Sequence, residues 1–400
     1  MISRLSTSML YQQSISQLQS RQASLAQLQG QMASGKKIVT AKDDPVGAGA
    51  AVRLDRALAE LEQFKSNGDA LRHRLGLQEN VLAQAGDALG RVSTLAVQAN
   101  GGTLSDADRR AIAIEVASLR DTLLDLANTP DGTGRYLFGG TRDGGVPFTD
   151  AGGGVAYNGD QTRRSVEIAP LMPVDDTLPG SEVFMRVRTG DGRIDAGMQP
   201  GNAGTGTITG FTLADSAQWN GGAYRVTFAA DGAYSVADAD GNPVANGTHA
   251  PGGTLAFAGL TLSIQGQPAD GDAFTVGPAP TRDVFATLDA LVGALNTAPT
   301  TDAQRAAQQN ALQGALRDIA TAQGHLIDAR ADGGARLATL DQADDLRMAQ
   351  GVTIESTLSD MRDLDYAEAI SRFELEMVAL EAAQLSFMQM QRLSLFDYMR

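Results

Sequence analysis

The three histidines are the first residues whose chemistry could define a site. His73, His249 and His325 lie far apart in the sequence, and none has a second histidine at the spacing of a metal-ligand pair. An isolated histidine is more often a surface or hydrogen-bonded residue than a catalytic base. The chain also has no cysteine, which excludes a thiolate nucleophile, a disulfide and a thiolate metal site. We therefore predict no catalytic residue, no cofactor and no metal site.

An acidic run at residues 238–242, DADGN, resembles part of a calcium-binding loop. The glutamate that would complete such a loop further along the chain is missing. The neighbouring segments AYSV and PVA are typical of strands on either side of a turn. A hairpin turn is therefore the preferred interpretation.

The glycine-rich segments do not have the order of a nucleotide-binding loop. Residues 201–206, GNAGTG, are not Gly-x-Gly-x-x-Gly, and they follow a proline-containing loop, so we expect a flexible loop there. The segments GTRDGG and GDGR are predicted to be turns. Asn246-Gly-Thr248 has the form of a glycosylation acceptor, but the start MISRLSTSMLYQQ does not predict a cleaved signal peptide.

Composition narrows the class of partner. The chain has 400 residues and a formal net charge of −15, which disfavours nucleic acid because phosphate contact needs a basic face. No segment approaches the roughly 20 apolar residues that span a bilayer, so we expect no membrane span. A length of 400 residues is enough for two or three domains, and 42% apolar residues is ordinary for a soluble, globular protein.

The elements divide the chain into three parts. Up to about residue 128, and again from about residue 302, glycine is sparse and apolar residues recur every three or four positions, which predicts helices. The glycine-rich middle has short alternating runs such as AYRVTF at 223–228, which predicts strands. We expect an α+β fold, with an elongated antiparallel helical bundle or coiled coil formed by both chain ends and an inserted, mainly-β central domain. The predicted segments are a terminal assembly helix (1–45), the N-terminal half of the bundle (46–138), the β domain (139–282), the C-terminal half of the bundle (283–355) and a C-terminal assembly helix (356–400).

Heptad spacing predicts three helices in the bundle. A first long helix carries seam residues of one register. A turn with a capping-box-like pair, Ser105 and Asp108, leads into a second, antiparallel helix that ends near Asn128, before a proline. A third helix returns from about residue 302, with Gly333-Gly334 as a weak spot. The seam residues of the first helix are Leu54, Leu61, Phe64, Leu71, Leu75, Leu82, Leu89 and Val92.

Each end of the chain carries one narrow apolar stripe with glutamines interleaved. Such stripes can bury only a thin core within one monomer, so we predict an assembly interface and tails that stay disordered until a partner covers them. The alternative is that both stripes simply face an intramolecular core. The predicted interface residues are Ile15, Leu18, Gln22, Leu25, Gln29, Met32, Ile370, Phe373, Met377, Leu380, Gln384 and Phe387.

Three segments resemble one protein family. Residues 34–49, SGKKIVTAKDDPVGAG, and the helix at 356–399 ending in LSLFDYM are similar to the two ends of the flagellin and hook-associated protein superfamily. Residues 135–148, RYLFGGTRDGGVPF, resemble its hook-associated members. The corresponding signature turn is Ser34, Gly35, Asp43, Asp44 and Pro45. In this turn Gly35 would end one helix, and the two aspartates would offer carboxylates to the next.

The resemblance implies a structural role without catalysis. It implies a subunit of the bacterial flagellum that forms a homo-oligomeric ring at the hook–filament junction, between hook-associated protein 1 and flagellin. It further implies a cytoplasmic export chaperone, flagellar type III export without a cleaved signal peptide, and an extracellular location. One alternative is a filament flagellin, which the LSLFDYM ending disfavours. The other, from a different class, is a secreted binding module or enzyme in which Trp219, Tyr224 and Tyr234 stack on a sugar, although such aromatics are more often core.

Overall fold

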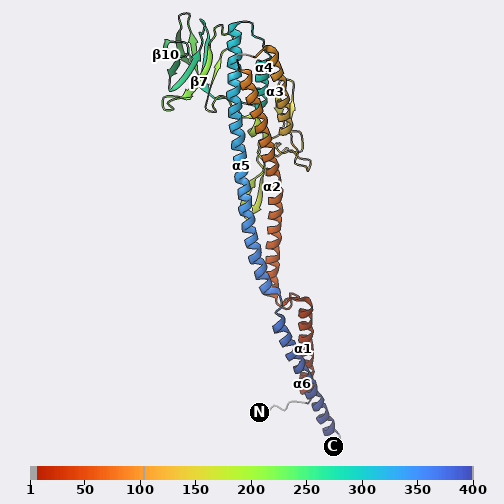
Figure 1. Ribbon diagram of the computed structural model, residues 1–400. Coiled ribbons are helices and arrows are strands. Elements are labelled where there is room, and N and C mark those ends of the chain that lie inside the picture. The colour runs from red at the N-terminus through yellow and green to blue at the C-terminus, as the bar shows by residue number, and fades with distance from the viewer. Residues whose placement is uncertain (1–6, 102–103, 399–400) are drawn as a thin grey trace. The chain divides into compact units, whose positions relative to one another are not determined.

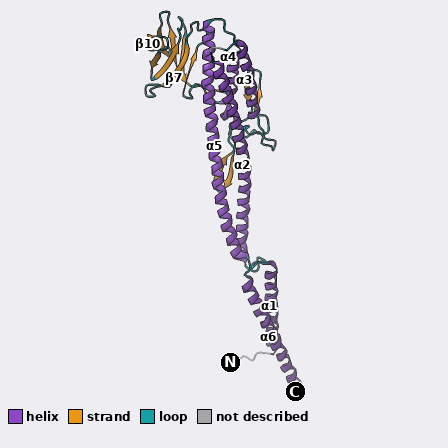
Figure 2. Cartoon of the chain, viewed as in Figure 1, coloured by secondary structure: helices purple, strands orange, loops and turns teal. Residues whose placement is uncertain are grey.

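The computed structural model describes residues 7–101 and 104–398 (Figures 1 and 2). The first six residues of the predicted segment 1–45 and the last two of 356–400 lie outside them, as do two residues of the predicted turn before Ser105. The helices are α1 (Thr7–Ser34), α2 (Pro45–Ala99), α3 (Asp106–Ala127), α4 (Val284–Asn296), α5 (Asp302–Arg362) and α6 (Tyr366–Tyr398). Helices at both ends and antiparallel strands between them confirm the α+β fold (Figure 2).

Contacts divide the chain into two compact units. One contains residues 1–66 and 343–400, and the other contains residues 67–342. The helices α2 and α5 contribute to both units. The strands all belong to the second unit.

The seam of α2 is buried in the second unit, as its heptads predict. Leu75, Leu82 and Leu89 are each 1% exposed or less. Two ion pairs fix α2 and α5 as antiparallel neighbours: Arg72 lies 3.0 Å from Asp341, and Glu79 lies 2.6 Å from Arg330. The helix α5 runs without interruption through Gly333-Gly334, where we expected a weak spot.

The predicted turn between the first two bundle helices is confirmed. The Ser105 hydroxyl accepts a hydrogen bond from the Asp108 N–H, and the Asp108 carboxylate accepts one from the Ser105 N–H, both at 3.2 Å. This reciprocal cap begins α3, which ends at Ala127, three residues before Pro130. An ion pair of 2.6 Å between Arg91 and Glu115 shows that α3 returns alongside α2.

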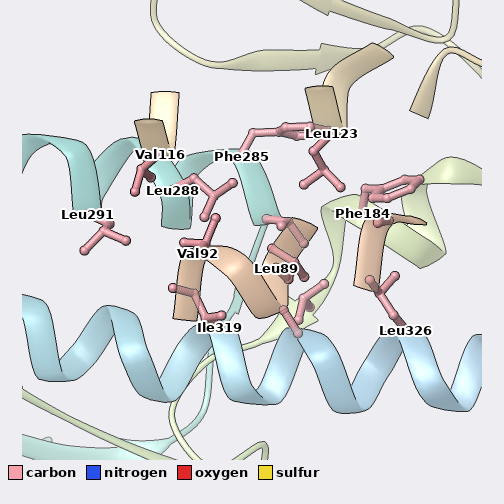
Figure 3. Packing of buried hydrophobic residues seen from close by; sticks show 14 of the residues in the cluster. Leu89, Val92, Val116, Leu123, Phe184, Phe285, Leu288, Leu291, Ile319 and Leu326 are labelled. Carbon is pink, nitrogen blue, oxygen red and sulfur yellow. The ribbon is translucent and has the colours of Figure 1, made fainter. Parts of the chain in front are cut away.

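The prediction of three bundle helices was incomplete, because the second unit has a fourth. The helix α4 begins after Asp283, whose carboxylate accepts a hydrogen bond from the Ala286 N–H. Figure 3 shows Phe285, Leu288 and Leu291 of α4 packed among side chains of three other helices. These neighbours are Val116 and Leu123 of α3, Leu89 and Val92 of α2, and Ile319 and Leu326 of α5.

Four phenylalanines extend this core into the small hairpins that follow α3. Phe138 packs edge-on against Phe184 with ring centroids 5.2 Å apart, and Phe148 contacts both Phe184 and Phe285 at 5.7 and 5.8 Å. Phe184 lies in a short π-helix, Ser181–Met185. The hairpin strands are β1 (Phe148–Asp150) with β2 (Val155–Tyr157) and β3 (Ser165–Ala169) with β4 (Met172–Asp175).

A separate β core lies further along the chain. Its five-stranded sheet has the order β10-β9-β8-β13-β6, and its three-stranded sheet has the order β11-β12-β7. Side chains of both sheets form one apolar cluster, including Ile208, Val226, Leu262 and Phe274. The strands are β6 (Ile194–Met198), β7 (Thr207–Leu213), β8 (Tyr224–Phe228), β9 (Ala233–Asp238), β10 (Pro243–Thr248), β11 (Thr254–Phe257), β12 (Leu260–Gln265) and β13 (Ala273–Pro278).

Two short strands connect this β core to the helices. The strand β5 (Val187–Arg188) enters it and β14 (Thr281–Arg282) leaves it, and the two pair with each other. Polar side chains of α5 hold the adjoining backbone: Asn310 accepts from the Ile208 N–H at 2.8 Å, and Asp318 accepts from the Gly190 N–H at 2.8 Å. The attachment to α5 is therefore made partly by directional hydrogen bonds.

A buried ionic network ties α2 to the loops around it. The Arg74 guanidinium pairs with Asp131, and its Nε donates to Asp176 at 2.9 Å. Burial alone would raise the pKa of Asp131. Hydrogen bonds from the Thr133 hydroxyl and N–H and from the Arg135 N–H, together with the charge of Arg74, nevertheless hold this pKa below its ordinary value.

The first prediction tests the bundle core. We expect Leu89→Ala to lower the free energy of unfolding by about 2–5 kcal/mol, because Leu89 is fully buried and its truncation leaves a cavity. The measurement is urea unfolding of the purified chain. Ile114→Ala, at an exposed position of α3, is the control and should change stability by less than about 0.5 kcal/mol. Equal effects of the two substitutions would contradict the packing described.

The second prediction concerns pH. Because the folded-state pKa of Asp131 is lowered, its contribution to stability is present above the unfolded pKa of about 3.9 and is lost as pH falls through the folded pKa. The stability difference between the natural chain and Asp131→Asn should be constant above about pH 5 and shrink below about pH 4. The exposed-turn variant Asp240→Asn is the control. A difference that stays constant down to pH 3 would show that Asp131 is not held as the carboxylate.

Candidate assembly surface on the terminal helices

The residues that could have done chemistry are not brought together. His73 is exposed, His249 packs on the Phe228 ring, and His325 Nε2 lies 2.7 Å from the Glu182 carbonyl oxygen. Within residues 7–101 and 104–398, no group of three or more histidine or acidic side chains is placed to hold a metal ion.

The acidic run at 238–242 forms the turn between β9 and β10, as predicted. The Asp238 carboxylate accepts hydrogen bonds from the N–H groups of Asp240 and Asn242, so its oxygens already have partners within the turn. The loop at 201–206, expected to be flexible, is held by Asp272, whose carboxylate accepts from the N–H groups of Ala203 and Gly204. Neither segment offers an open binding loop.

The three aromatics of the sugar-binding alternative do not form one exposed face. Tyr224 is 4% exposed and belongs to the β core. Trp219 and Tyr234 are half-buried and pack against that core. The Trp219 indole N–H donates to the Gly222 carbonyl, so its polar edge has a partner within the turn.

The signature segment forms the connection from α1 to α2. Gly35 has φ +69°, a conformation that favours glycine, and directly follows the last residue of α1, Ser34. Asp44 precedes Pro45, the first residue of α2, and its carboxylate accepts from the N–H groups of Val46 and Gly47 at 3.1 and 2.9 Å. Gly35, Asp44 and Pro45 of this turn therefore each have a local structural role: Gly35 follows the end of α1, Asp44 caps α2 and Pro45 begins it.

Asp43 stabilises the loop before this cap. Its carboxylate accepts hydrogen bonds from the Thr40 N–H at 2.8 Å and the Val39 N–H at 3.2 Å. The Thr40 N–H is the main cause that holds the pKa of Asp43 below its ordinary value. The same connection pairs with the chain before α6, because Lys37 N donates to the Arg362 carbonyl at 2.7 Å and Leu364 N donates to the Gly35 carbonyl at 3.0 Å.

The helices α1 and α6 pair in antiparallel fashion. Arg21 forms an ion pair of 3.0 Å with Glu376, and the Tyr11 and Phe387 rings have centroids 5.2 Å apart. At the other end of the pair, the Tyr366 hydroxyl donates to the Met32 carbonyl at 3.2 Å. The two chain ends therefore meet through their helices.

Seven of the twelve predicted interface residues are half-buried in this pairing, and five are exposed. On α1 the half-buried positions include Leu18, Leu25 and Met32, while Gln22 and Gln29 are exposed. Ile15 is also half-buried. On α6 the half-buried positions include Phe373, Leu380 and Phe387, while Ile370, Met377 and Gln384 are exposed. The second row of the α6 seam consists instead of Ala369, Glu376 and Ala383, each one position before the predicted residue.

This offset leaves a second apolar face on α6 without a partner in the described chain. Ile370 and Met377 are 44% and 43% exposed. Sequence reasoning missed three more apolar residues of this face. At 100° per residue all five fall within an arc of about 100°, which also contains the exposed Glu374 and Glu381. The additional residues are Val378, Leu385 and Met388.

No helix of the described chain combines the length and apolar character that crossing a membrane requires. Independently of that finding, an exposed apolar face is a candidate surface for contact with another protein.

Comparison with known proteins first defines the class. Residues 5–143 match the bacterial flagellin N-terminal helical region, and residues 199–278 match the D2-like domain of flagellar hook-associated protein 1. The first match contains α1, α2, α3 and the signature turn, and the second contains most of the β core. The chain is thus a flagellin-like protein with a hook-associated type of β domain.

Full-length relatives define the family. A crystal structure of Xanthomonas campestris FlgL is 50% identical, with a TM-score of 0.72, over 76% of this chain and 99% of that one. Flagellar hook-associated protein 3 of Escherichia coli is 27% identical over 98% of this chain and 99% of its own length. The match to a Borreliella burgdorferi filament core protein is partial: 33% identity over 26% of this chain and 32% of that protein. The chain belongs to the flagellar hook-associated protein 3 (FlgL) family and is a component of the bacterial flagellum.

The third prediction tests how firmly the two ends are held in the monomer. We expect the amides of α1 and α6 to exchange with solvent much faster than those of α3, because their seam side chains are mostly half-buried. Limited proteolysis should leave a resistant fragment of about residues 45–360. The measurements are hydrogen exchange and proteolysis on a verified monomer. Protection of α6 equal to that of α3 would contradict the prediction.

Proposed function

We propose that this protein is a structural subunit of the hook–filament junction and that it acts by assembly rather than by catalysis. The full-length relatives, which are hook-associated protein 3 and FlgL by name, support the junction role. Among the described residues, no group of three or more histidine or acidic side chains is placed to hold a metal ion. This finding is compatible with a structural role, but the evidence for that role comes from the relatives.

The observation that carries the assembly role is the exposed apolar face of α6. The pairing of α1 with α6 uses the row of Phe373, Leu380 and Phe387 and leaves Ile370 and Met377 open to another protein. Burying such side chains against another subunit contributes about 25 cal/mol of favourable free energy for each Å² of apolar surface removed from water. This face is therefore the proposed site of contact between neighbouring subunits.

The finer parts of the proposal concern partners and location. The subunit would form a homo-oligomeric ring, contact hook-associated protein 1 on one side and flagellin on the other, and bind a cytoplasmic export chaperone before export. It would leave the cell through the flagellar type III apparatus without a cleaved signal peptide and act outside the cell. A cysteine-free chain supports this route, because it cannot be cross-linked in transit.

The two alternative functions are less well supported. A filament flagellin is disfavoured because the flagellin matches cover only part of this chain, whereas the hook-associated relatives cover nearly all of it. A sugar-binding module or enzyme is disfavoured because Tyr224 is buried and Trp219 and Tyr234 pack on the β core.

The fourth prediction separates assembly from folding. In cells that lack their own copy of the protein, Ile370→Ser together with Met377→Ser should leave the protein exported but not retained, so that flagellin is shed unpolymerised. The melting temperature of the purified variant should stay within about 2 °C of the natural chain, because both side chains lie outside the α1–α6 seam.

Ile114→Ser, at an exposed isoleucine of α3, is the matched control and should support normal filaments. The amounts of variant protein and of flagellin in the culture medium are measured separately, because an export defect would also prevent assembly. Normal filaments with the α6 double variant would show that this face is not an assembly surface.

A further inference from the structure

A groove that several charged side chains line lies in the unit of residues 67–342, between the chain around β5 and one face of α5, with β7 at its side. Its volume is about 750 Å³. Arginines from two elements line it: Arg186 and Arg188 at β5, and Arg317 on α5.

Local structure explains why these side chains face one another. Arg186 directly precedes β5 and Arg188 ends it; both side chains are exposed, whereas Val187 between them is buried. On α5, Arg317, Thr321 and His325 follow at intervals of four residues and therefore share one side of the helix. The groove is thus built by two regular elements.

These three arginines differ from most others in their pairing. Arg74, Arg120 and many other arginines lie within ion-pair distance of a carboxylate, whereas Arg186, Arg188 and Arg317 have no such partner among the described residues. Two carboxylates, Asp191 and Asp328, also line the groove. One Asp191 oxygen already accepts from the N–H groups of Arg193 and Ile194.

Arg317 has the strongest need for a ligand. Its guanidinium carbon lies 5.0 Å from the centre of the Phe211 ring, which orients the planar group. Its Nε is buried and has no hydrogen-bond partner among the described residues. Burial lowers the pKa of Arg317, although the charges of Asp195 and Asp318 oppose that shift. A carboxylate in the groove would place negative charge beside this guanidinium, whose charged form burial disfavours.

We propose that this groove binds a carboxylate side chain from an acidic segment of a second copy of the chain. Guanidinium groups match the planar, two-oxygen geometry of carboxylates. The chain supplies that ligand in abundance, because its 47 acidic residues exceed its 32 lysines and arginines. The proposal rests on the proposed function, since neighbouring copies meet only where the protein assembles.

The first test is made in assembled flagella. The photo-reactive residue p-benzoylphenylalanine replaces Ala320, an exposed residue of α5 that lines the groove, in otherwise complete chains. In cells whose filaments this chain restores, irradiation should cross-link two copies through a peptide that contains aspartate or glutamate. Arg186→Gln with Arg188→Gln should reduce the yield by roughly tenfold or more, because each lost charge-assisted contact weakens binding by about that factor. Arg225→Gln, at an exposed arginine of β8, is the control and should leave it unchanged.

Restored filaments without this cross-link, a cross-link to flagellin or hook-associated protein 1 instead, or an unchanged yield in the arginine variant would overturn the inference and leave the proposed function intact. A second test does not depend on assembly. The purified full chain should bind a labelled hexaglutamate peptide, and Arg317→Gln, the paired variant Arg186→Gln with Arg188→Gln, and added salt should each weaken the binding. No saturable binding at about 1 mM peptide would overturn the inference even where filaments form normally.

Discussion

The two ends of the chain are helices whose apolar side chains cannot be buried by either helix alone. Pairing α1 with α6 is the solution within one chain, fixed by the Arg21–Glu376 ion pair and the Tyr11–Phe387 contact. This pairing buries few side chains completely, Ala369 at 3% exposure being one. A contact of this kind is weak within a monomer, so its stability depends on what neighbouring molecules add.

The register of the α1–α6 pairing also determines which apolar side chains of α6 remain exposed. The large side chains Ile370 and Met377 favour a seam that includes them when the sequence is considered alone. In the structure, Ala369 and Ala383 take those places, and Glu376 between them pairs with Arg21. The small side chains of Ala369 and Ala383 let the two helices approach closely, while the larger side chains of Ile370 and Met377 stay exposed. Because the two seam registers differ by one residue, heptad counting could not choose between them.

Sequence reasoning was most reliable where a local rule decides the outcome. The cap of Ser105 and Asp108 and the buried leucines of α2 follow from spacing alone. The helix α4 was missed because it is short, although Asp283 before an apolar repeat is a recognisable start. The groove beside Arg317 could not be predicted at all, since it depends on how β5 lies against α5, a helix that is distant in the sequence.

The pairing of β5 with β14 has a consequence for how this family can vary. The strands that enter and leave the β core are neighbours, and Thr189 N donates to the Pro280 carbonyl at 3.0 Å. A segment whose two ends are adjacent can be exchanged, lengthened or removed at the cost of closing one short loop. The β core is therefore an insertion between two adjacent strand ends, and exchanging it would also remove the hydrogen bonds that Ile208 and Gly190 donate to Asn310 and Asp318 of α5.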